Sequence, residues 1–319
     1  MAELDNNLEM SRNFSLENKT KLSKKIIKEV FAKDKLIIRL VFITACILIV
    51  YFIYYFIIWN VYYSFTDWDG LIITNNFVGF DNYENLFNNY IFWESLKNNL
   101  MLMGIFIPCS LVLGLFLAIL LDQKIRKQGV FRAIYLLPYA LSFVVTAKLW
   151  RWMLTGDGVI NSIFDLFGLE FLQQAWLSNP DISMISISIA LIWQFSGYVM
   201  LVFLAAIRSV PKSHIMAAQT DGASGFTIYI RVIIPQIKTS TFTAFVILMI
   251  FSLKAFDFIY ILTGGGPGYA TTILPIYMFE RFALSEYAYA ATIATTMFLL
   301  VMLIVVPYLY ITYRKKKED

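Results

Sequence analysis

Side chains that carry out covalent chemistry are scarce in this sequence of 319 residues. His214 is the only histidine, so neither a Ser-His-Asp triad nor a metal site built on histidines can form. The nucleotide-binding pattern G-x-x-x-x-G-K-[ST] does not occur. Thr263–Gly268 is rich in glycine, but no Lys-Ser/Thr follows it, so it indicates a turn and not a phosphate cradle. We therefore expect no catalytic residue, no metal ion and no ATP hydrolysis on this chain, which is not an enzyme.

A polar loop at residues 208–238 lies between two long apolar stretches and has a pattern suited to contact with another protein. A short helical run ends at Asp221–Gly222, because glycine accepts left-handed backbone angles at little cost. Helical spacing resumes over 223–234, and Pro235 marks the end of this second run. The loop has about 30 residues, which is long for a connection between helices of a bundle. We interpret it as a docking knob; the alternative is an ordinary hairpin at a membrane surface.

The first helical run of this loop combines a cap with small side chains. Ser213 comes two residues after Pro211 and can accept a free backbone N–H at the start of the run. Met216 stands where a glutamate would complete a capping box, so the reciprocal half of the box is missing. Alanines favour a helix and let a partner approach closely. The residues that we assign to docking are Met216, Ala217, Ala218, Asp221, Gly222, Ala223 and Pro235.

Membrane helices must hold this loop in place. The chain is 59% hydrophobic and 15% charged, with a mean hydropathy of +0.67, which is too apolar for a soluble domain of this size. A helix of about 20 apolar residues crosses the hydrocarbon core of a bilayer. We therefore expect an all-α integral membrane protein, with the docking helix between its fourth and fifth spans. The six expected spans are 36–59, 100–121, 130–154, 182–207, 239–262 and 288–313.

The basic residues set the orientation of these spans. Of the 26 lysines and arginines, 21 fall in four regions that would share one face of the membrane: 1–39, 122–132, 208–238 and 314–319. That face is cytoplasmic, so both termini and the docking loop would lie in the cytoplasm. The chain then divides into a cytoplasmic segment at 1–35, a membrane domain at 36–313 and a basic tail at 314–319. The net charge of +4 reflects this topology and contact with anionic lipid, and it does not indicate nucleic-acid binding.

Short motifs from about residue 60 to the end of the chain follow a distinctive order. They are Phe77–Tyr83, Leu137–Tyr139, Trp150–Trp152, Gly158–Asn161, Trp193 with Gly197, Ile207–Pro211, Phe256–Asp257 and Thr263–Pro267. The docking loop adds Ala-Ala-x-x-Asp-Gly-Ala, with a proline thirteen residues after the glycine. Together these motifs resemble the permease subunits of carbohydrate-type ABC importers, similar to those of the maltose and multiple-sugar families.

The resemblance implies an ATP-driven importer of sugars, either di- or oligosaccharides, in which this chain forms half of the translocation path. Its partners would be a second permease subunit in a heterodimer, two ATP-binding subunits and an extracytoplasmic solute-binding protein. ATP and Mg²⁺ would bind the ATP-binding subunits, and no cofactor would bind this chain. The 213–235 loop would be the coupling loop that those subunits contact. The complex would lie in a bacterial cytoplasmic membrane as a multi-pass assembly.

One position of the coupling loop departs from the family. The family carries an acidic residue that supports contact with the ATPase, and this chain has Met216 there. A thioether can pack in an apolar cleft but offers no carboxylate. We therefore predict that this chain docks mainly by apolar packing and that the second permease carries the acidic loop.

Sugar sites combine aromatic faces with hydrogen-bonding side chains, because pyranose rings have apolar faces and polar rims. Similarity to the maltose permease places sugar contacts near Gln194 and Tyr198 in the fourth span and near Phe251 and Ser252 in the fifth. Ala255 shares a helix face with Phe251 by its i, i+4 spacing. Helix packing explains any one of these residues equally well.

Two further features lie inside the expected spans. Lys254 and Asp257 are three residues apart, so on one helix they can form an ion pair that shields both charges. Direct contact with the solute is the alternative for this pair. Pro108 and Pro138 would kink their spans, because proline removes a helical hydrogen bond.

Two other transport classes remain open. An ABC permease for another solute, such as glycerol phosphate, a polyamine or a peptide, would differ in the charge along its path. An anionic solute in particular would need more basic residues there than Lys254 and Lys148. A stand-alone secondary carrier is the second alternative, and it should show discontinuous helices, paired intramembrane charges or two similar halves. Apart from the possible pair of Lys254 and Asp257, the sequence shows none of these features.

Overall fold

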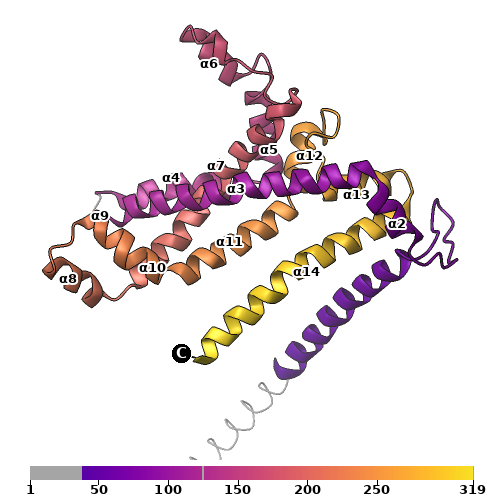
Figure 1. The fold of residues 1–319 in the computed structure, drawn as a ribbon, viewed down its shortest axis with the longest axis horizontal. Helices are drawn as coiled ribbons and strands as arrows, with labels where there is room; N and C mark the ends of the chain where they lie inside the picture. The colour runs from indigo at the N-terminus through magenta and orange to yellow at the C-terminus, as the bar shows by residue number, and fades with distance from the viewer. Residues whose placement is uncertain (1–37, 124–125, 319) are drawn as a thin grey trace, which may run out of the picture. The chain divides into compact units, whose positions relative to one another are not determined.

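The computed structural model describes residues 38–123 and 126–318 (Figure 1). Within these residues it contains no β-strand, and one isolated bridge joins Thr66 to Phe77. The expected all-α class is therefore confirmed. The segment expected at 1–35 lies outside the described residues. The tail expected at 314–319 is, as far as Glu318, the end of one long helix.

The described chain is a succession of helices. Ile38–Tyr63 comes first. The others, in chain order, are α2 (Asp81–Asn88), α3 (Tyr90–Asp122), α4 (Gln128–Ala140), α5 (Phe143–Met153), α6 (Val159–Leu166), the 3-10 turn η1 (Glu170–Leu172), α7 (Pro180–Ser209), α8 (Lys212–Thr220), α9 (Gly225–Ile228), the π-helical turn η2 (Tyr229–Ile233), α10 (Ile234–Gln236), α11 (Lys238–Leu253), α12 (Phe256–Thr263), α13 (Leu274–Ala283) and α14 (Tyr287–Glu318).

Four of these helices are long and apolar enough to cross a membrane: Ile38–Tyr63, α3, α7 and the Tyr287–Pro307 part of α14. Two further candidates are pairs of helices joined by a sharp bend. Gln128–Ala140 meets Phe143–Met153 at 92°, and Gly225–Gln236 meets Lys238–Leu253 at 69°. If each bent pair counts as one, the described residues contain up to six candidate spans by length and composition, although the first half of the second pair falls in the loop that we expected outside the membrane.

The chain divides into two compact units between Asn60 and Val61. In the first unit the helix that begins at Ile38 stacks aromatic rings one turn apart. The ring centroids of Tyr51 and Tyr55 are 5.8 Å apart, and those of Phe52 and Phe56 are 6.5 Å apart. No residue of the most apolar part of this helix is buried. An apolar helix of this kind is suited to an environment of lipid or another protein.

The core of the second unit is built around α7, which packs on α3, α4 and α11. Of the most apolar part of α7, 67% is buried, whereas 39% of the corresponding part of α3 is buried. Glycines allow the helices to approach closely. A Cβ at Gly114 of α3 would lie 2.5 Å from the Val199 side chain of α7, and one at Gly197 of α7 would collide with the Tyr135 carbonyl oxygen of α4. Small residues at helix crossings are typical of membrane bundles.

The two ends of α3 serve different parts of the second unit. α8 and α9 lie near the Asp122 end, whereas α2 and α13 lie at the Tyr90 end (Figure 1). Given the basic residues near Asp122, the first end corresponds to the expected cytoplasmic face and the second to the outer face.

Two expected spans differ from the structure. The stretch 130–154 breaks at Leu141–Ser142, where both residues are extended, three residues after Pro138. The stretch 239–262 breaks after Leu253, and a new helix begins at Phe256. Hydropathy reports only that a segment is apolar, so it does not reveal such breaks. By contrast, α3 continues past Pro108 without a break.

Candidate functional site

The coupling segment, which we define as residues 212–237, begins with α8. Gly222 has φ +78° and provides the expected left-handed break after Asp221, whose N–H donates to the Ala217 carbonyl at 3.0 Å. Contrary to the expectation, Ser213 does not cap the helix. α8 already begins at Lys212, so Ser213 lies within the first turn, and no side chain caps that end.

The second half of the coupling segment differs from the expected run at both ends. It begins at Gly225, and Ser224 caps it by accepting the Thr227 N–H at 3.3 Å. It does not end at Pro235, which lies in the first turn of α10, directly after the π-helical turn η2. A regular α-helix would place the Pro235 ring against the carbonyl of Arg231. The wider π turn avoids this clash, so the helical path continues past the proline.

One side of the coupling segment is anchored and the other is open. Ile228, Ile233 and Ile237 are buried in the same core as α3 and α7. The side chains of Met216 and Phe226 are 58% and 77% exposed. Of the other residues that we assigned to docking, Ala217, Asp221, Gly222 and Pro235 are exposed, and Ala218 and Ala223 are half-buried.

α8 is tied to the end of the same segment through His214. Its Nδ1 lies 3.0 Å from Oε1 of Gln236 in α10. The segment therefore folds back on itself, and it presents α8, which contains no buried residue, at its outer surface. This geometry can transmit a push on α8 to the buried isoleucines behind it.

The residues expected to contact sugar lie around a cluster of aromatic rings centred on Phe195. The ring centroids of Phe251 and Phe195 are 4.8 Å apart, and Tyr198 stacks on Tyr139 at 4.9 Å. Tyr139 in turn contacts Phe195 at 5.7 Å. The structure thus brings Tyr198 and Phe251 into one aromatic cluster, where they pack the helices together.

The polar residues expected to contact sugar differ in how many hydrogen-bond partners they have within the protein. Ser252 is buried, and its hydroxyl donates to the Met249 carbonyl of its own helix at 2.8 Å. Gln194 is also buried; its Nε2 lies 3.5 Å from the Leu141 carbonyl, at the break between α4 and α5. Its Oε1 has no hydrogen-bond partner. Ala255 is half-buried beside the second helix break. The Gln194 Oε1 is therefore a buried acceptor that is available to a ligand.

The structure shows no ion pair between Lys254 and Asp257, where the sequence analysis expected one. α11 ends at Leu253 and α12 begins at Phe256, so the two residues do not share a continuous helix face. Both are exposed. Among the described residues, the ion pairs join Glu94 to Lys97, Asp122 to Arg208 and Arg281 to Glu286. The i, i+3 rule does not apply across a helix break.

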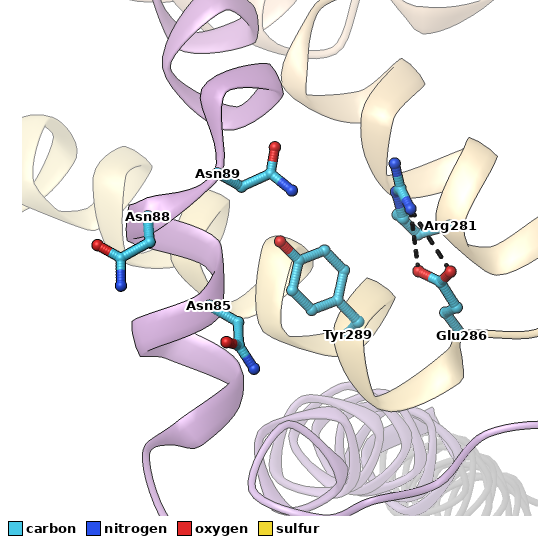
Figure 2. A pocket seen from close by; sticks show the side chains of 6 residues that line it. All are labelled: Asn85, Asn88, Asn89, Arg281, Glu286 and Tyr289. Carbon is cyan, nitrogen blue, oxygen red and sulfur yellow. Dashed lines mark hydrogen bonds and ion pairs between the residues drawn. The ribbon is translucent and has the colours of Figure 1, made fainter.

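A polar pocket of about 330 Å³ lies near the Tyr90 end of α3, and the sequence did not reveal it. Its lining residues, shown in Figure 2, are Asn85, Asn88, Asn89, Arg281, Glu286 and Tyr289. An Nη1 donor of Arg281 contacts Glu286 Oε2 at 3.2 Å, and the guanidinium lies over the Tyr277 ring at 5.1 Å. Burial disfavours the charged form of Arg281, but these neighbours outweigh it and raise the pKa. The asparagines of α2 and of its C-terminal end, at 85, 88 and 89, were the available signal.

Comparison with known proteins identifies the family. Residues 110–315 match the family of the binding-protein-dependent transport system inner membrane component. A "probable ABC transporter permease protein" of Pyrococcus horikoshii is 54% identical over 88% of this chain and 97% of its own length. The xylose/arabinose import permease protein of Haloferax volcanii is 42% identical over 81% of this chain and 82% of its own length.

Solved structures agree with the sequence relatives. A crystal structure of a bacterial ABC transporter involved in the import of the acidic polysaccharide alginate covers 75% of this chain and 84% of its own chain. It has a TM-score of 0.63 and 25% sequence identity. A second structure, with a TM-score of 0.62, shows the alginate transporter in complex with an alginate pentasaccharide-bound periplasmic protein.

The bent helix pairs therefore do not indicate a stand-alone carrier, although discontinuous helices are a feature of that class. An all-helical membrane fold, a coupling segment anchored on α3 and α7, and these relatives agree with one another. The chain belongs to the family of binding-protein-dependent transport system inner membrane components, the permease subunits of ABC importers.

Proposed function

We propose that this permease imports a sugar, driven by ATP that is hydrolysed on two partner subunits. The observation that carries the proposal is the coupling segment, which is buried through Ile228, Ile233 and Ile237 and exposes Met216 and Phe226. Exposed apolar side chains on a short helix at the cytoplasmic end of a membrane bundle are typical of a protein interface. An ATP-binding subunit is the partner that this family uses there.

The ATP-binding subunits would hold ATP and Mg²⁺, and this chain would hold no cofactor. Met216 offers a thioether to the partner, so contact would rest on packing, and the acidic loop would belong to the second permease of a heterodimer. An extracytoplasmic solute-binding protein would deliver the sugar to the opposite end of the bundle. Both termini would lie in the cytoplasm, as the distribution of basic residues favours.

A sugar is the proposed cargo because one named relative is a xylose/arabinose import permease protein and one similar structure is a transporter involved in alginate import. A di- or oligosaccharide remains our expectation for its size. Gln194, whose Oε1 is unpartnered beside the Phe195 aromatic cluster, is the side chain that would hydrogen-bond a sugar hydroxyl. Tyr198 and Phe251 lie in that cluster, and together with Ser252 and Ala255 they would shape the path.

Uptake by the purified complex tests this proposal. The complex, isolated through a tag on this chain, would be reconstituted into vesicles with ATP inside and supplied with its solute-binding protein. We expect ATP-dependent uptake of a labelled saccharide, with a disaccharide competing better than a pentose. Uptake of glycerol phosphate or a polyamine in place of sugars would overturn the cargo. Uptake by this chain without any ATP-binding subunit would overturn the mechanism.

A further inference from the structure

Asp122, the last residue of α3, joins three parts of the second unit. Its Oδ2 accepts a hydrogen bond from the Tyr229 hydroxyl at 2.7 Å, and its Oδ1 lies 3.6 Å from Nε of Arg208. Gln123 adds a donor, because its Nε2 lies 3.1 Å from the Tyr229 oxygen. We define these four residues as the Asp122 clasp.

The three elements that meet in the clasp are those that coupling must connect. Asp122 ends α3, Arg208 lies in the last turn of α7, and Tyr229 opens the π-helical turn of the coupling segment. α3 and α7 pack on each other along the core of the bundle. Each oxygen of one carboxylate therefore serves a different element, so a shift of Tyr229 pulls on the ends of both helices.

The clasp adds to an anchor that already exists. Ile228, Ile233 and Ile237 are buried behind the segment, whereas the side chains of Asp122 and Arg208 are 23% and 48% exposed. Partly exposed ion pairs contribute little to stability. Folding therefore does not depend on the clasp, and its four polar side chains are available for another task.

We infer that the Asp122 clasp fixes the register of the coupling segment against α3 and α7 and passes its displacement to both helices together. Apolar packing between smooth isoleucine surfaces allows one element to slide over another, but a directed hydrogen bond to a carboxylate resists this sliding. The π turn at Tyr229–Ile233 supports this inference, since π-helical turns often occur at functional positions. The inference rests on the proposed function, because it describes how ATP-driven motion reaches the bundle.

Tyr229→Phe removes the hydroxyl and leaves the ring and the Arg208 contact in place. In the reconstituted complex we expect ATP hydrolysis close to that of the wild type and a drop of at least about fivefold in sugar imported per ATP, the lower end of usual coupling between sites. Tyr90→Phe is the matched control, since Tyr90 is 69% exposed at the opposite end of α3. The double variant Asp122→Asn with Tyr229→Phe should lose no more sugar import per ATP than the single variants do, since both changes break one network.

Hydrogen exchange of residues 225–237 tests the clasp without reference to transport. Tyr229→Phe should speed this exchange, and Tyr90→Phe should not. Unchanged exchange, or an unchanged ratio of uptake to hydrolysis in an assembled complex, would overturn the inference. So would failure of Tyr229→Phe to assemble, since the clasp would then be needed for folding. If the wild-type complex imports nothing with ATP while the exchange result holds, the proposed function fails and the clasp remains.

Discussion

Gly222 illustrates how one backbone angle shapes the coupling segment. Its φ of +78° lies in the left-handed region, and a Cβ built on it would meet no atom within 4 Å. A side chain there would therefore be strained without a clash. For a residue other than glycine the left-handed region costs about 1–2 kcal/mol, and β-branched residues tolerate it least.

We predict that Gly222→Val leaves the complex assembled but lowers ATP-driven uptake by about tenfold, because about 1–2 kcal/mol of strain is relieved by moving α8 out of place. Gly225→Ala is the matched control, since Gly225 has no positive φ and equal space around it. Uptake and assembly should be measured for both variants. Wild-type uptake by Gly222→Val would refute the coupling assignment.

Lys254 and Asp257 are a second case at the scale of the residue. Because no ion pair joins them, removal of one charge should not leave the other without a partner. We predict that Lys254→Met and Asp257→Asn have independent effects on uptake, and that the double variant multiplies the two single effects. If the double variant instead recovers activity lost by Lys254→Met, the two residues do pair in some state of the transport cycle.

At the scale of the element, close helix crossings determine how the bundle assembles. α7 crosses α4 so closely that Gly197 faces the Tyr135 carbonyl, and it crosses α3 where Gly114 faces Val199. The obstacle at Gly197 is backbone and not the flexible end of a side chain. Helix α4 would therefore have to move as a unit to accept even a methyl group.

We predict that Gly197→Ala lowers stability by about 1–3 kcal/mol, the usual effect of overpacking a filled core. Thermal unfolding of the detergent-solubilised complex measures this change. Gly104→Ala in α3 is the control: nothing lies within 4 Å of its Cβ position, and alanine is the better helix former. Equal stability of the two variants would contradict the close crossing.

At the scale of the whole molecule, the permease depends on surfaces that it cannot bury alone. The helix Ile38–Tyr63 has no buried residue in its most apolar part, and α8 has none at all. Lipid can cover the first surface. The second lies at the expected cytoplasmic end, and the proposed ATP-binding subunit would cover it.

We predict that Met216→Ser weakens co-purification of the ATP-binding subunits by about tenfold or more, because burying a methionine side chain contributes about 1.5–3 kcal/mol. Met216→Leu should preserve the complex, since leucine has similar volume and no charge. If both variants retain the subunits equally, the docking contact lies elsewhere on the coupling segment.

Local properties of the sequence were enough for much of this description. Apolar stretches of membrane length predicted the all-α class, and Asp221–Gly222 predicted the break after α8, since hydropathy and glycine angles depend on near neighbours. Only the tertiary structure decided where apolar stretches bend, as at Leu141–Ser142, and that Pro235 lies inside a helix. It also joined Asp122 to Tyr229, which are 107 residues apart. Such a contact depends on how α3 and α7 pack, and no local pattern records that packing.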